Sequence, residues 1–75
     1  MSHSRIPRMA NQIAQAFASR REAEQVAGVA GHINDFWEPR MRRELLQRLA
    51  EDPGGFHPLV VAAHGLIRDP DAAAA

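Results

Sequence analysis

The chain contains no cysteine, lysine, threonine or tyrosine in its 75 residues. Without cysteine it can form neither a disulfide nor a thiolate metal site, and this absence fits a reducing compartment. A chain of this length forms at most one domain and buries only roughly 60% of its unfolded surface. So small a domain can depend on a partner for part of its stability.

Long hydrophobic runs are also missing. The apolar runs extend over a few residues only, far short of the roughly 20 that a membrane-spanning helix needs. The first twelve residues, MSHSRIPRMANQ, lack the apolar core of a secretory signal. We therefore expect a cytoplasmic protein that has no membrane span.

Charge is balanced overall but arranged in blocks. The nine basic residues, all arginine, match nine acidic ones, which argues against a general nucleic-acid binder. Residues 1–21 carry four Arg and no acid, and residues 22–38 carry four acids and no Arg. Residues 39–50 are again mainly basic, and residues 51–75 mainly acidic. Such alternation favours the packing of successive elements against each other or against a partner.

The hydrophobic pattern predicts four helices and no strand. Pro7, Pro39 and Pro58 suit the first turn of a helix, and EDPGG at 51–55 is a strong stop signal. We therefore predict an all-α fold, a small domain of three to four helices with short loops over residues 1–68, followed by a flexible tail over 69–75. The helices are expected at about 6–19, 22–37, 39–50 and 58–67.

The second of these helices has a continuous apolar stripe on one side. On its other side, Gly28 and Gly31 each cost about 1 kcal/mol relative to alanine. These glycines are either tolerated weak points of an exposed surface or a groove of small residues that another backbone approaches. The stripe consists of Val26, Val29, Ala30, Ile33, Phe36 and Trp37.

Catalytic signatures are missing from the sequence. His57 and His64 lie seven positions apart, roughly 10 Å along a helix, which is too far for one metal ion without further ligands. The only hydroxyl side chains are serines, and none of them lies in a nucleophile motif. No glycine-rich phosphate loop follows a strand. We expect no catalytic, cofactor-binding or metal-binding residue in this chain.

The segment HINDFWEPRMRREL, residues 32–45, combines the only tryptophan with three arginines. A tryptophan is rarely covered completely in so small a chain, and Trp beside Arg at a helix corner is typical of a protein-binding anchor. Phe36 and Trp37 can also belong to the core. Arg40, Arg42 and Arg43 loosely imitate a DNA-recognition helix, so a DNA-binding protein and a free-standing helical regulator are the alternatives.

Three segments resemble a known family. MANQIAQAF at 9–17, VAGVAGHINDFWEPRMRRELL at 26–46 and HPLVVAA at 57–63 are similar to the delta subunit of NAD-dependent formate dehydrogenases. The resemblance implies an accessory subunit of a molybdenum- or tungsten-dependent enzyme with alpha, beta and gamma subunits. In that enzyme the alpha subunit carries a bis-pterin-guanine-dinucleotide metal centre, and iron–sulfur clusters and FMN pass electrons to NAD.

The resemblance also implies how the chain acts. It would stabilise the catalytic alpha subunit, or assist the loading or retention of the molybdenum cofactor, without holding a cofactor itself. We expect the alpha subunit to contact the motif residues, with Arg42 and Arg43 pairing with its carboxylates. The expected contact residues are Asn11, Gln12, His32, Asn34, Phe36, Trp37, Pro39, Arg40, Met41, Arg42 and Arg43.

Overall fold

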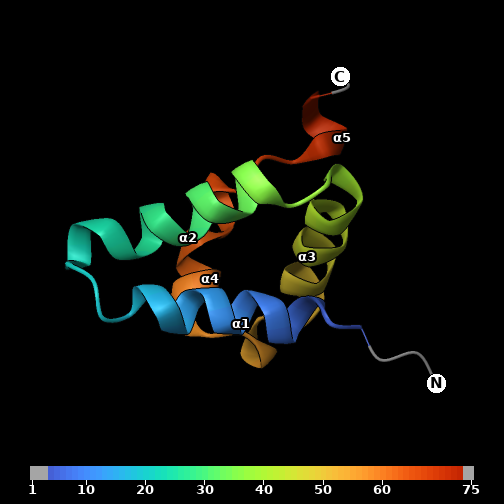
Figure 1. Ribbon diagram of the computed structural model, residues 1–75. Coiled ribbons are helices and arrows are strands. Elements are labelled where there is room, and N and C mark those ends of the chain that lie inside the picture. The colour runs from blue at the N-terminus through green and yellow to red at the C-terminus, as the bar shows by residue number, and fades with distance from the viewer. Residues whose placement is uncertain (1–3, 74–75) are drawn as a thin grey trace.

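The computed structural model describes residues 4–73, and helices dominate this part of the chain. No strand occurs among these residues, so the predicted all-α class is confirmed. Four helices form the body of the domain and a single short turn follows them (Figure 1). The α-helices are α1 (Ile6–Phe17), α2 (Glu22–Phe36), α3 (Pro39–Glu51), α4 (Pro58–Ala63) and α5 (Pro70–Ala73), with 3-10 turns η1 (Pro53–Gly55) and η2 (His64–Leu66).

Prolines define where the helices begin, as the sequence predicts. Pro7, Pro39 and Pro58 lie in the first turns of α1, α3 and α4, where a missing N–H breaks no helical hydrogen bond. The predicted helix ends agree to within two residues for α1, α2 and α3. The fourth helix is shorter than expected, because α4 ends at Ala63 and the chain continues as the 3-10 turn η2.

The helices enclose one hydrophobic core. α1 and α2 lie side by side, α4 packs against both of them, and α3 packs against α1 at the end where α1 begins (Figure 1). Residues between the helices also contribute, since Trp37, Phe56 and Ile67 are all buried. The remaining core side chains are Ile6, Ala10, Ala14, Val29, Ala30, Ile33, Leu45, Leu49, Val60 and Ala63.

The two glycines of α2 have different surroundings. A β-carbon on Gly28 would lie 2.4 Å from two ring atoms of Phe17, so α1 approaches α2 closely here. The neighbour is a side chain of the same domain and not another backbone. A β-carbon on Gly31 would meet nothing within 4 Å, so this position lies on open surface.

The segment after η2 packs against the rest of the domain. Pro70 begins α5, which lies beside α3, and Asp71 forms an ion pair with Arg43 of α3 at 3.0 Å. Both side chains of this pair are at least half exposed. The flexibility of residues 69–75 stays a prediction, and positions 74 and 75 lie outside the described residues.

Candidate protein-binding site

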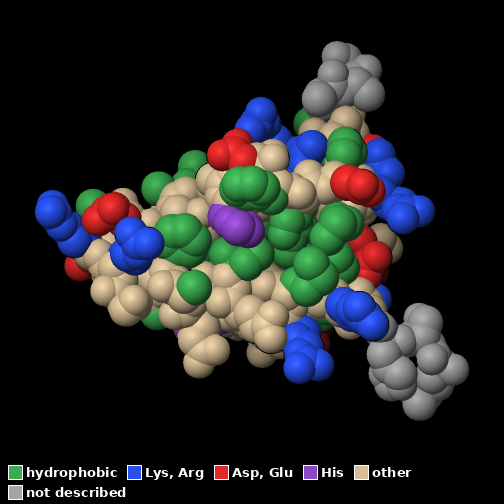
Figure 2. Space-filling model, in the orientation of Figure 1, with side chains coloured by type: hydrophobic (Ala, Val, Ile, Leu, Met, Phe, Trp, Pro, Cys, Tyr) green, Lys and Arg blue, Asp and Glu red, His purple; other side chains and the backbone are tan. Residues whose placement is uncertain are grey.

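A shallow groove of about 330 Å³ runs along the face that α1 and α2 form together. Figure 2 shows hydrophobic side chains gathered around a histidine on this face. His32 lines the groove from α2, and Trp37 forms another part of the lining. The residues that α1 contributes are Met9, Gln12, Ile13 and Ala16.

The groove exists because α1 is apolar over a wider arc than the core can cover. At 100° per residue, its apolar side chains span roughly 160°, whereas an arc of about 100° is enough to face a core. Ala10 is therefore completely buried, Met9 and Ile13 are half-buried, and Ala16 is exposed. These α1 residues, apart from Gln12, were not predicted from the sequence as a binding surface, although the width of the arc was a readable signal. The arc comprises Ile6, Met9, Ala10, Ile13, Ala14, Ala16 and Phe17.

Phe36 stands at the rim of the groove and is 74% exposed. Its ring centroid lies 4.8 Å from that of His32, with the two rings tilted by 37°. Phe36 belongs to the apolar stripe expected on α2, but the alternative that places its ring in the core is wrong. Around the axis of α2, Phe36 is offset from Ile33 toward α1. Within residues 4–73, no core side chain covers its ring at this position.

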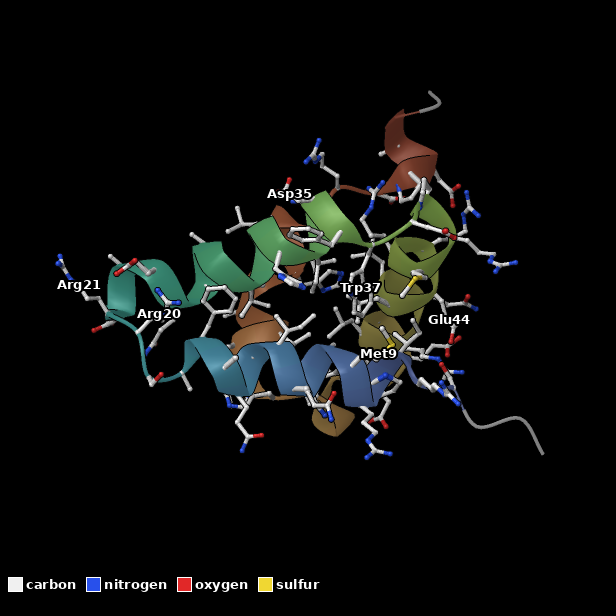
Figure 3. All side chains as sticks on the ribbon, viewed as in Figure 1. Met9, Arg20, Arg21, Asp35, Trp37 and Glu44 are labelled. Carbon is white, nitrogen blue, oxygen red and sulfur yellow. The ribbon has the colours of Figure 1, made fainter. Side chains whose placement is uncertain are left out.

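Trp37 is a core residue, with only 6% of its surface exposed. α2 ends at Phe36, and the extended backbone of Trp37 turns its indole inward, between α2 and α3 (Figure 3). The expectation that so small a chain leaves its tryptophan partly uncovered is therefore wrong. The exposed aromatic ring of the motif is that of Phe36.

Asn11 binds backbone within the domain. Its Oδ1 accepts a hydrogen bond from the His57 N–H at 2.8 Å, and its Nδ2 donates to the Gly55 carbonyl at 3.3 Å. These two groups flank Phe56, which has extended backbone and a buried side chain. The amide thus replaces the partners that an extended residue would find in a sheet, and it holds the start of α4 against α1.

Asn34 makes the same arrangement at the end of η2, the 3-10 turn that follows α4. Its Oδ1 accepts from the Arg68 N–H at 2.8 Å, and its Nδ2 donates to the Leu66 carbonyl at 3.0 Å. Between these groups lies Ile67, again extended and buried. Both asparagines of the predicted contact set therefore serve the fold directly.

The arginines of the motif differ in their partners. Arg42 donates hydrogen bonds to the carbonyls of Arg68 at 2.8 Å and Trp37 at 3.5 Å. Arg43 pairs with Asp71, and Arg40 is exposed. Arg42 and Arg43 thus have partners within the chain.

The structure therefore brings part of the predicted contact set together. Gln12 and His32 line the groove with Trp37, and Phe36 stacks beside His32. Met41 lies next to this surface, because it lines with Met9 a wider depression of about 730 Å³ between α1 and α3. Arg40 and Arg43 line this same depression and are exposed, and Pro39 is exposed at the start of α3.

Glu44 joins α3 to the start of α1. Its carboxylate accepts hydrogen bonds from the Ser4 hydroxyl and from Arg48 Nε, the latter at 2.9 Å. These bonds, with that from Ser4 the larger cause, hold the pKa of Glu44 below its ordinary value of 4.5. The Ser4 hydroxyl also accepts from the Ile6 N–H at 3.2 Å. Ser4 thus supports the first turn of α1, although Arg5 occupies the N-cap position.

Residues 4–73 hold neither a cluster of metal-ligating side chains nor a membrane-spanning helix. Within that span no three His, Asp or Glu side chains come close enough to hold a metal ion. No helix of the same span is long and apolar enough to cross a bilayer.

Comparison with known proteins yields one family. The family model described as the NADH-dependent formate dehydrogenase delta subunit FdsD matches residues 5–64. The matched span includes α1 to α4 with every residue that lines the groove, and it ends before α5. A search of curated proteins finds no match.

Proposed function

Because the chain belongs to the formate dehydrogenase delta subunit family, we propose that it is a non-catalytic accessory subunit that binds the alpha subunit of a formate dehydrogenase through the α1–α2 groove. In this proposal the chain works in the cytoplasm, within a complex that also contains beta and gamma subunits. Its role is to stabilise the alpha subunit, to help it load or retain the molybdenum cofactor, or both.

One observation carries the proposal. The chain leaves a groove of mainly apolar side chains open on the face of α1 and α2, with Phe36 74% exposed at its rim. Contiguous apolar surface of this kind on a small domain is typical of a protein interaction site, since water contact with it is unfavourable. The flexible side chain of Met9 in the groove can adapt to the shape of a partner, and the exposed ring of Phe36 can act as an aromatic anchor.

The cofactors of the reaction belong to the partners in this proposal. The chain has no cysteine to ligate an iron–sulfur cluster and no glycine-rich phosphate loop for FMN or a pterin dinucleotide. We expect the alpha subunit to hold the bis-pterin-guanine-dinucleotide molybdenum or tungsten centre. The delta chain would then influence the metal centre only through the stability of the protein around it.

Capture of the tagged full-length chain from native cytoplasm tests the proposal. We expect the large formate dehydrogenase subunit to co-elute in fixed proportion, together with molybdenum or tungsten measured by mass spectrometry. Co-elution with metal-free enzyme alone would identify the chain as a maturation factor. Recovery without any formate dehydrogenase subunit would contradict the proposed function.

Replacement of two alanines by glutamate, one at a time, locates the contact. Ala16 lines the groove and is exposed, so Ala16→Glu places a charge in the groove without disturbing the core. Ala27 is an exposed residue of α2 that lies five positions before His32, about 140° around the helix. We expect Ala16→Glu to reduce capture at least tenfold and Ala27→Glu to leave it unchanged. Equal capture by both variants would contradict the assignment of the groove.

A further inference from the structure

Two arginines mark the two ends of the apolar wall that α1 contributes to the groove. Arg5 immediately precedes α1, and Arg20 follows it in the turn toward α2. No acidic residue lies between positions 4 and 21. Figure 3 shows Arg20 beyond one end of α1, while Met9 lies near the other end, close to α3.

Neither arginine has a carboxylate partner within residues 4–73. Arg21, Arg43, Arg48 and Arg68 each form an ion pair in this part of the chain, whereas Arg5 and Arg20 form none. The guanidinium carbon of Arg20 lies 5.8 Å from the ring centroid of Phe17, which continues the apolar wall of α1. On the facing wall, His32 and Phe36 supply no carboxylate.

Arg5 adds a positive charge at the N-terminus of α1. A helix N-terminus carries partial positive charge, so it favours acids, but the first turn of α1 has none and Arg5 occupies the N-cap. The Glu44 carboxylate already reaches the start of α1 through Ser4 and lines the same depression as Arg5. Arg5 itself forms no ion pair within residues 4–73, so its guanidinium is the group that a partner carboxylate would meet. The unpaired guanidinium of Arg5 is therefore the feature of this end that favours an anionic group.

We propose that the groove binds an amphipathic helix of the partner, with an apolar centre over Met9 and Ile13 and carboxylates near both ends, over Arg5 and Arg20. This inference rests on the proposed function, because it names the segment that the alpha subunit inserts. The 12 residues of α1 lie between the two arginines and span roughly 18 Å, or just over three turns. A helix suits the site better than an added strand, since the described part of the chain offers no strand edge.

Synthetic helical peptides test this inference independently of the alpha subunit. Two peptides of about 16 residues share the same apolar positions at i, i+4, i+7 and i+11, and differ only in having Glu or Lys at both ends. Their binding to the full-length chain is measured by fluorescence anisotropy. We expect the Glu-flanked peptide to bind at least tenfold more tightly, and its affinity to fall as salt increases.

Charge reversal with a matched control identifies the arginines responsible. We expect the Arg5→Glu/Arg20→Glu variant to lose the preference for the Glu-flanked peptide. The control Arg21→Glu/Arg68→Glu changes the net charge equally but alters only long, exposed ion pairs of 3.9 and 3.8 Å, so the preference should remain. Circular dichroism verifies that both variants keep their helices. Glu at position 5 favours α1, because an acid suits the positive end of the helix dipole.

Each outcome decides between the alternatives. Equal affinity for the two peptides, or no binding of either, overturns the inference of an acid-flanked helix even where the alpha subunit is captured. Loss of the preference in both double variants also overturns it, because the effect would then follow net charge. Unchanged binding of the Glu-flanked peptide to the Ala16→Glu variant overturns the assignment of the groove as the binding site. Failure of the proposed function is distinct, since it shows only in the capture experiment with native enzyme.

Discussion

Phe36 and Trp37 are adjacent in the chain, but the side chain of one is 74% exposed and that of the other only 6% exposed. The boundary between them is the end of α2, because Phe36 is its last helical residue and Trp37 has extended backbone. The Trp37 ring therefore belongs to the core, whereas the Phe36 ring is open to the proposed binding surface. Substitutions at the two positions can therefore test stability and the proposed binding separately.

Substitution of each ring should affect a different property. Trp37→Ala removes a large buried side chain and should lower the free energy of unfolding by about 3–5 kcal/mol, enough to unfold much of a domain this small. Phe36→Ala should change it by less than about 0.5 kcal/mol, because the ring is exposed, while weakening capture of the alpha subunit. Urea denaturation and the capture assay measure the two effects. A stable Trp37→Ala variant that fails to bind would restore the tryptophan as the anchor.

The hydrogen bonds that Asn11 and Asn34 make to the backbone should contribute to the free energy of unfolding. Asn34→Ala removes hydrogen bonds to the Leu66 carbonyl and the Arg68 N–H, so we expect a loss of about 1–2 kcal/mol by urea denaturation. Asn11→Ala should behave similarly. Gln12→Ala is the control, because Gln12 is an exposed neighbour on α1 and should cost less than about 0.5 kcal/mol. An equal loss of unfolding free energy in Asn11→Ala and Gln12→Ala would contradict the structural role of the Asn11 hydrogen bonds.

The two glycines of α2 should respond differently to alanine. Gly31→Ala gains helix propensity on open surface and should raise the free energy of unfolding by up to about 1 kcal/mol. Gly28→Ala has the same gain, but its β-carbon would lie 2.4 Å from the Phe17 ring, which must move. We therefore expect Gly28→Ala to be less stable than Gly31→Ala in thermal unfolding. The reverse order would show that Phe17 moves without cost.

Glu44 should make stability depend on acidity. Its folded-state pKa is lowered, so its contribution is fully present above the ordinary value of 4.5 and is lost as pH falls through the folded-state pKa. The wild-type chain should therefore exceed Glu44→Gln in unfolding free energy near neutral pH, and this difference should shrink below about pH 4.5. Urea titrations of both chains over this range measure it. A difference independent of pH would exclude the carboxylate charge as its source.

Removal of residues 69–75 tests the proposed end of the domain at Arg68. Truncation there deletes the exposed Arg43–Asp71 ion pair, and such pairs contribute about 0–1 kcal/mol. We expect the shortened chain to unfold within about 1 kcal/mol of the full one in urea denaturation. Asp71→Asn isolates the ion pair. A much larger destabilisation on truncation than on Asp71→Asn would make α5 an integral part of the domain.

The sequence by itself determined the helical class, the starts of α1, α3 and α4, and most of the core. Proline in a first turn and the Asp-Pro-Gly-Gly stop act locally, and apolar spacing defines the inner face of each helix without reference to its neighbours. The resemblance carried by residues 9–63 likewise agrees with the matched family.

Only the tertiary structure decided what each motif residue does. The side-chain directions of Phe36 and Trp37 depend on where the helix ends relative to α3, and the roles of Asn11 and Asn34 depend on backbone groups more than 30 positions away. Arg42 finds its carbonyl partner at Arg68 for the same reason. The groove arises because α2 and α4 cover only part of the apolar arc of α1, and no local pattern states how much surface a neighbouring helix will cover.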